Sequence, residues 1–565
     1  MPVPITPARL ARGAALAVAL LPALPASAAS PGFAGAYLAA RHAQAENDYA
    51  IAARFFARAL ERDPGRARLI EETVIARIAA GDVAQAAALA EQAGEAGGPG
   101  IAAVRLAAAA RAGDFDAILE GRAGAGISRV MDTLVAGWAA LGQGDSERAR
   151  AAFDSMSSES PALARFNLAL ALALQGDFEG AQAIFEEAGG ELASNRRGVL
   201  AHIRILSQIG RNDAALSLLE RAFGPSLDPE MAALRTRLEA GEALPFTAVT
   251  SARDGIAELL FAFAGALDGQ RAATAGLLYA RLAAWIRPDL VDAHLLVGQR
   301  LASVGQHDLA LAAFRAVNED DPASYAARLG EAGALQDAGR SDEALALLDS
   351  IAARYPDLQA PHVTKGDILR SAEKWAPARA AYDAAIARFG AERDEQWSIY
   401  FARGICSERL GDWQKAEADF THALELSPQR AEVLNYLGYS LVERRERLDT
   451  ALAMIRTAVD LRPESGFIID SLGWALYRLG RHEEALPHMV RAATLESSDP
   501  IVTDHLGDVL WAVGRRMEAR FEWRRALKLS PEPELAERIR RKLEAGLDAV
   551  LAAEGETPLD AGDGD

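Results

Sequence analysis

The sequence has little cysteine and little positive charge. Cys406 is the only cysteine among 565 residues, so neither a disulfide framework nor a cysteine metal site can form within the chain. We expect Cys406 to be a small buried hydrophobic residue rather than a reactive thiol. The formal net charge is −19, which argues against nucleic-acid binding because that function requires a basic surface facing the phosphates.

Long hydrophobic runs are also scarce. The apolar stretch at 14–24 follows Arg9 and Arg12 and precedes the small residues Ala26, Ser27 and Ala28. This pattern predicts a signal peptide over residues 1–29, cleaved near Ala28, and export to the periplasm. The stretch is short for a membrane span, although an uncleaved anchor is the alternative. No cysteine lies near the cleavage site, so a lipoprotein anchor is not expected, and no transmembrane segment is expected in the mature chain.

Motifs for catalysis are missing too. The sequence contains no HExxH, no GxxxxGK[ST] and no GxSxG, and its nine histidines share no spacing. We therefore predict a protein that is not an enzyme, with no catalytic residues, no cofactor and no metal site. An enzyme with an unrecognised site is the less favoured alternative. Function is expected to come from a binding surface.

A repeat of 34–35 residues is what the sequence does contain, most clearly within 431–533. Each of three consecutive segments has a Leu-Gly pair, then an alanine, a bulky apolar residue and a second alanine at matching positions. These are Leu437, Gly438, Ala451, Ile455 and Ala458, then Leu472, Gly473, Ala485, Met489 and Ala492, then Leu506, Gly507, Ala519, Trp523 and Ala526. Small residues at this spacing allow two helices to approach closely, while the bulky residue fills the gap between hairpins.

This pattern resembles the tetratricopeptide repeat, a helix–turn–helix unit, and weaker copies begin near residue 33. The resemblance implies an all-α, right-handed superhelical solenoid of about 12–14 hairpins. The expected domains are a signal peptide (1–29), an N-terminal subarray (30–223), an irregular junction (224–256), a C-terminal subarray (257–533), a capping helix (534–552) and a disordered acidic tail (553–565).

Two of these segments carry specific expectations. The junction contains Pro225, Pro229, Pro245 and Gly255, and it is either a hinge or partner-binding loop, or a drifted repeat with an insertion. The capping helix is expected to turn its charged face to solvent. That face contains Arg538, Arg540, Arg541 and Lys542.

The resemblance also implies a concave groove, lined by the first helix of each hairpin, that binds peptides of partner proteins. The residues implied are Asn435, Tyr436, Tyr439, Asp470, Ser471, Trp474, Tyr477, Asp504, His505, Asp508 and Trp511. Tyr and Trp are frequent energetic anchors at interfaces. The alternative for Tyr477 and Trp511 is packing along the inner wall. The lysine and asparagine clamp for a C-terminal carboxylate is not evident.

A narrower resemblance is carried by the segments at 435–452, 470–486 and 504–527, together with 255–264 and 277–289. They resemble long envelope repeat proteins of Gram-negative bacteria, which include a lipoprotein adaptor of a periplasmic carboxyl-terminal processing protease. This implies a non-catalytic periplasmic scaffold that brings an envelope protease or cell-wall enzyme to its substrates. The alternative is an assembly factor for envelope polysaccharide export or outer-membrane protein biogenesis.

Overall fold

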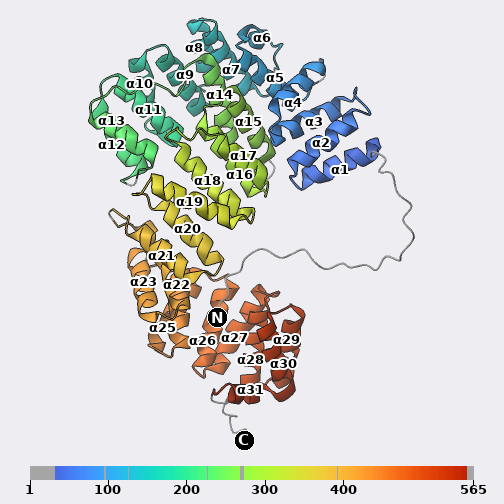
Figure 1. Cartoon of the computed structure of the whole chain (residues 1–565), viewed down its shortest axis with the longest axis vertical. Coiled ribbons are helices and arrows are strands. Elements are labelled where there is room, and N and C mark those ends of the chain that lie inside the picture. The colour runs from blue at the N-terminus through green and yellow to red at the C-terminus, as the bar shows by residue number, and fades with distance from the viewer. Residues whose placement is uncertain are drawn as a thin grey trace. The chain divides into compact units, whose positions relative to one another are not determined.

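The structure is a computed structural model that describes residues 32–94, 97–124, 126–225, 227–267, 273–390 and 392–556. The predicted signal peptide and residues 557–565 of the predicted tail lie outside these residues. The regular elements that are described are all helical, which confirms the predicted all-α fold of helical hairpins. The chain divides into two compact units, one up to Thr364 and the other from Lys365 (Figure 1).

The N-terminal unit begins with six consecutive helical hairpins. Their helices are α1 (Phe33–Ala45), α2 (Tyr49–Leu60), α3 (Ala67–Ala80), α4 (Val83–Gln92), α5 (Pro99–Ala112), α6 (Phe115–Leu119), α7 (Arg129–Gly142), α8 (Ser146–Ser155), α9 (Pro161–Leu174), α10 (Phe178–Glu187), α11 (Arg196–Gln208) and α12 (Asn212–Phe223). Several second helices begin at an aspartate whose carboxylate caps the first turn, as Asp177 does by accepting from the Gly180 amide.

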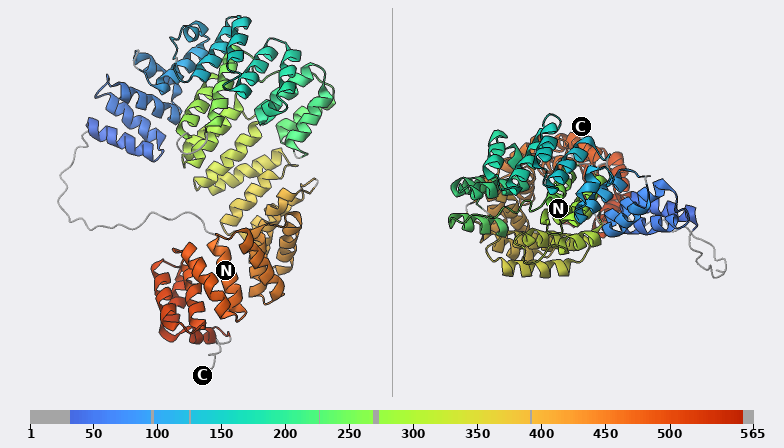
Figure 2. Two further views of the ribbon diagram at one scale, coloured as in Figure 1. Left: turned by 180° about the vertical axis from the view of Figure 1, so that it is seen from behind. Right: turned by 90° about the horizontal axis from the view of Figure 1, so that it is seen from above.

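After these hairpins the same unit continues with α13, with two helices that pack differently, and with two further hairpins, α16 with α17 and α18 with α19. They are α13 (Pro229–Glu239), α14 (Ala252–Ala266), α15 (Ala273–Ile286), α16 (Val291–Ser303), α17 (His307–Arg315), α18 (Ser324–Asp337) and α19 (Ser341–Arg354). Helix α14 packs against α7 and α9, and α15 packs against α3 and α5. Figures 1 and 2 show this pair on the inner side of the arc that the first hairpins form. We call α14 and α15 the inner layer.

Close contacts hold the inner layer in place. A Cβ atom on Gly255 would lie 2.2 Å from the ring of Trp138 on α7, so glycine is required for α14 to approach this closely. Arg111 Nη1 on α5 donates to the carbonyl oxygen of Trp285 at 2.6 Å. Glu258 on α14 is buried and forms an ion pair with Arg197 on α11. The inner layer is therefore part of the core of this unit.

The expected junction at 224–256 lies inside the N-terminal unit, and the division between units falls at Thr364 and Lys365, within α20 (Ala360–Ser371). Residues 224–256 include α13 and the first turn of α14. Their prolines and Gly255 break the repeat because here the chain leaves the array and turns back to form its inner layer.

The C-terminal unit continues the hairpin pattern. After α20 come α21 (Trp375–Ile386), α22 (Trp397–Arg409), α23 (Trp413–Leu426), α24 (Ala431–Glu443), α25 (Leu448–Leu461), α26 (Gly466–Arg478), α27 (His482–Leu495), α28 (Pro500–Ala512), α29 (Arg516–Lys528), α30 (Pro533–Ala545) and α31 (Leu547–Ala553). As the spacing predicted, the small repeat residues lie where two helices approach closely and the bulky ones fill the gap. Ala519 and Trp523 are fully buried, and a Cβ atom on Gly507 would lie 2.4 Å from the Trp523 ring.

Candidate protein-binding surface

The predicted groove residues all lie on α24, α26 and α28, which are the first helices of three successive hairpins. Helix α26 packs against both α24 and α28, so the structure brings the predicted residues onto one continuous face. We call the face formed by these three helices the inner surface of the C-terminal unit. Its residues divide into a partly exposed group and a buried group.

The partly exposed group is Asn435, Tyr436, Tyr439, Trp474 and His505. The Tyr436 hydroxyl donates to Glu408 at 2.7 Å, and Trp474 Nε1 donates to Glu443 at 3.1 Å. Asn435 Nδ2 donates to the Ser471 hydroxyl at 3.2 Å. These hydrogen bonds fix the side chains while leaving part of each accessible.

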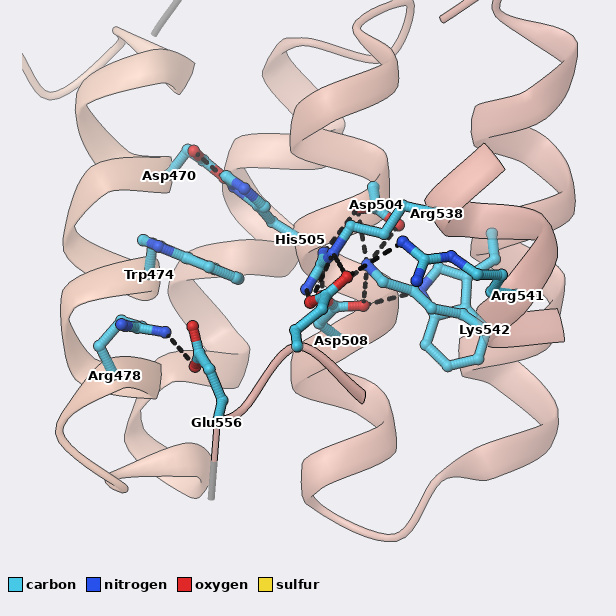
Figure 3. Close-up of polar contacts among 12 residues, drawn as sticks. Asp470, Trp474, Arg478, Asp504, His505, Asp508, Arg538, Arg541, Lys542 and Glu556 are labelled. Atoms are coloured by element: carbon cyan, nitrogen blue, oxygen red, sulfur yellow. Dashed lines mark hydrogen bonds and ion pairs between the residues drawn. The ribbon is translucent and has the colours of Figure 1, made fainter. Parts of the chain in front are cut away.

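His505 joins the aromatic group to an acidic residue. Its ring stacks on Trp474, with centroids 4.0 Å apart, and its Nδ1 lies 3.0 Å from a carboxylate oxygen of Asp470 (Figure 3). Burial acts to lower the pKa of His505, but the charge and hydrogen bond of Asp470 outweigh it, so the pKa is raised. The histidine is thereby held in its charged form to higher pH than usual.

The other predicted residues are buried rather than exposed. They are Asp470, Ser471, Tyr477, Asp504, Asp508 and Trp511, each less than one tenth exposed. For Tyr477 and Trp511 the burial agrees with the packing alternative. Tyr477 stacks on Trp474, and Trp511 lies against Trp523. Of the predicted groove residues, only the partly exposed group is therefore accessible to a partner while the end of the chain is in place.

Asp504 and Asp508 are buried because both bind the ammonium group of Lys542. Lys542 Nζ donates to the two carboxylates at 2.7–2.9 Å, and Lys542 is 0% exposed. The expectation that Lys542 belongs to a solvent-facing charged surface is therefore wrong. Burial and the neighbouring charge of Asp508 raise the pKa of Asp504, while Lys542 opposes the shift.

The end of the chain also differs from expectation, because the predicted single capping helix is two helices. Gly546 separates α30 from α31 and has a φ of +87°, a conformation that favours glycine. A Cβ atom at Gly546 would lie 2.7 Å from the Trp511 ring, and Trp511 Nε1 donates to Asp548 at 2.9 Å. The break thus allows α31 to turn onto the inner surface beside Trp511.

Sequence reasoning missed several residues of this surface. Phe467 is 39% exposed and lies one helical turn before Ser471, on the same face of α26 as Trp474. Arg478 lies one turn after Trp474, and its Nη1 is 2.6 Å from a carboxylate oxygen of Glu556. The four-residue spacing along α26 could have identified both.

The described part of the chain offers no metal-binding group and no reactive cysteine. There, no group of three or more His, Cys, Asp or Glu side chains is placed to bind a metal ion. Cys406 is fully buried, and burial raises the pKa of its thiol to about 11, as expected for a structural cysteine. Within the same residues, no helix combines the length and the apolar character needed to cross a bilayer.

Known proteins resemble the chain in both units. Tetratricopeptide repeat models match residues 134–194, 301–364 and 367–532. The TPR repeat-containing protein PA4667 of Pseudomonas aeruginosa is 28% identical over 167 residues, which are 29% of this chain and 28% of that protein. The lipoprotein NlpI homolog of Haemophilus influenzae is 36% identical over 110 residues, which are 19% of this chain and 34% of that protein. The chain thus spans about a third or less of the length of these curated relatives.

A solved structure, that of the APC/C hetero-tetramer Cut9–Hcn1, aligns with 91% of this chain and 96% of its own, at 15% identity and a TM-score of 0.38. The family follows from the sequence matches, the helical hairpins and the buried positions of the repeat. On these grounds, the chain belongs to the tetratricopeptide repeat family.

Proposed function

We propose that this protein is a non-catalytic scaffold or adaptor of the bacterial envelope and that it binds a protein partner through an aromatic surface. The aromatic surface consists of Tyr436, Tyr439, Phe467 and Trp474. Tetratricopeptide repeats support protein–protein interaction in general. The observation that carries the proposal is that these rings stay partly exposed on the C-terminal unit, whereas the first helices α3, α5, α7 and α9 of the N-terminal unit pack against the inner layer.

The aromatic surface is suited to binding because its rings are already held in place. Trp474 is fixed by its hydrogen bond to Glu443 and by stacking on His505. Tyr436 is fixed by Glu408. Side chains that are ordered before binding lose less conformational entropy when a partner arrives, and Tyr and Trp are the residue types most often found as energetic anchors.

The envelope location and the kind of partner are inferred from the sequence and from one relative. The predicted signal peptide favours export, and one relative is named a lipoprotein. The narrower resemblance described above favours an envelope protease or cell-wall enzyme, with a periplasmic carboxyl-terminal processing protease as the candidate partner. We infer that the scaffold brings such an enzyme to its substrates.

Affinity capture from the envelope fraction tests this proposal. The wild-type chain is compared with a Tyr439→Ala, Trp474→Ala variant and with a control variant, Met517→Ala, Phe521→Ala, whose two residues are strongly exposed on α29. We expect the wild type and the control to recover a processing protease, and the aromatic-surface variant to lose it with unchanged helical circular dichroism.

Three results would count against the proposal. Equal recovery by all three proteins would contradict binding at the aromatic surface. Recovery of polysaccharide-export or outer-membrane-assembly subunits in place of a protease would favour the assembly-factor alternative. Fractionation that places the protein in the cytoplasm would contradict the envelope location.

A further inference from the structure

The last described residues of the chain, 547–556, cover part of the inner surface of the C-terminal unit. We call them the end segment. It consists of α31, which is 7 residues long, and the three residues that follow. Leu547, Val550 and Leu551 are buried on one side of α31, and Asp548 accepts from Trp511. The apolar side of the end segment therefore packs where the indole of Trp511 lies.

The carboxylates at the end of this segment are paired with arginines from two other helices. Glu554 lies 3.1 Å from Arg538 and 3.2 Å from Arg541, both on α30. Glu556 lies 2.6 Å from Arg478 on α26 (Figure 3). Burial acts to lower the pKa of Arg538, but Asp508, Asp504 and Glu554 together raise it. The raised pKa means that these carboxylates stabilise the charged guanidinium group.

These three arginines contact the end segment on a protein that is acidic overall. The chain as a whole carries a formal charge of −19. Asp504 and Asp508 pair with Lys542, and they lie farther from Arg538, at 3.9 and 3.6 Å. Glu443 lies 4.0 Å from Arg478. Without Glu554 and Glu556, the three arginines would therefore be left without their closest carboxylate partners.

The end segment shares a buried core with the last repeat through Leu547 and Leu551, but α30 lies between it and α29. Helix α30 packs directly on α29, and it is α30 that supplies Lys542 to the buried carboxylates of α28. Helix α31 packs on α30 and is joined to it through Gly546. A helix this short is only marginally stable without tertiary contacts. The end segment thus resembles a bound peptide more than an end cap.

We propose that the end segment is a built-in competitor at a binding site for an acidic, amphipathic segment of a partner protein. Such a segment has apolar residues that pack beside Trp511, followed by two carboxylates two residues apart that pair with Arg478 and with Arg538 and Arg541. The inference rests on the proposed function and adds the chemistry of the ligand and the competition that regulates it. The partner segment binds when the end segment detaches.

Peptide binding to the full chain tests the proposal. The probe is a fluorescent peptide with the sequence of residues 546–556, GLDAVLAAEGE, and binding is followed by fluorescence anisotropy. The released variant is Glu554→Gln, Glu556→Gln. The matched control, Glu534→Gln, Glu544→Gln, makes the same charge change at exposed positions of α30.

We expect the released variant to bind the probe at least about tenfold more tightly than the wild type or the control, because a tethered competitor acts at a high effective concentration. A probe with glutamine in place of both glutamates should bind more weakly. Adding Arg478→Ala and Arg541→Ala to the released variant should abolish binding, with unchanged circular dichroism.

Hydrogen exchange of residues 547–556 shows whether the end segment has detached. A second variant also weakens the apolar contact of the segment; it combines Leu551→Ala with Glu554→Gln and Glu556→Gln. A segment that stays protected in both variants is a fixed part of the fold and overturns the proposal. The proposal is also overturned if the segment detaches and the probe still does not bind. It is overturned as well if the variant forms a dimer, with twice the mass of one chain, in which two copies exchange their end segments. None of these results depends on the capture experiment with Tyr439 and Trp474, so the two proposals can fail separately.

Discussion

The two units of this protein use the same hairpin repeat but treat its inner face differently. In the N-terminal unit the inner layer packs against the first helices α3, α5, α7 and α9, and Gly255 and Trp138 are in close contact there. In the C-terminal unit the equivalent face keeps Tyr439 and Trp474 partly exposed. A repeat array therefore does not by itself provide a binding groove. Whether a groove is available depends on whether the chain covers that face with its own helices.

The largest effect is expected from Lys542→Ala, which should unfold the end of the C-terminal unit and leave the N-terminal unit intact. The change leaves two buried carboxylates without their ammonium partner, and breaking such a pair costs about 3–5 kcal/mol. Hydrogen exchange resolved by segment would show the loss at residues 500–556. Lys528→Ala, at an exposed position, is the control, and equal protection in both variants would contradict the role given to Lys542.

Gly255→Ala should have the next largest effect, this time on the N-terminal unit. The new methyl group would meet the Trp138 ring, and overpacking of this kind costs about 1–3 kcal/mol. Gly265→Ala in the same helix, where nothing lies within 4 Å of the added Cβ atom, is the matched control. Urea unfolding should separate the two variants. Equal stability would mean that the inner layer is not packed as tightly as described.

A smaller, pH-dependent effect is expected from His505. Because the folded-state pKa is raised, the His505–Asp470 pair contributes stability that is fully present below the unfolded pKa of about 6.5 and is lost as pH rises through the folded pKa. Replacing His505 with glutamine should flatten this part of the stability–pH curve. An identical curve for both proteins would show that the pair does not titrate as described.

The repeat positions could be predicted from the sequence because they depend on local spacing. Met489 meets Gly473 within one hairpin, so the period alone places it, and the shared period also places α24, α26 and α28 side by side. The burial of Asp504 and Asp508 could not be predicted in this way. Their partner Lys542 directly follows Arg540 and Arg541 in the sequence, and a run of basic residues like this is also typical of a solvent-facing helix surface.

The inner layer escaped prediction for a similar reason. The segment at 255–264 is apolar and helical whether it continues the array or covers it. Contacts between residues far apart in the sequence determine that this segment covers the array, such as those of Arg111 with Trp285 and of Arg197 with Glu258. No local pattern encodes such pairings.

The most direct test of the central claim is hydrogen exchange of the full chain with and without the captured partner. The account predicts that the partner slows exchange in α24 and α26, at residues 431–443 and 466–478, and leaves α5, α7 and α9 unchanged because the inner layer already covers them. Protection that appears in α5, α7 and α9 while α24 and α26 stay unchanged would contradict it.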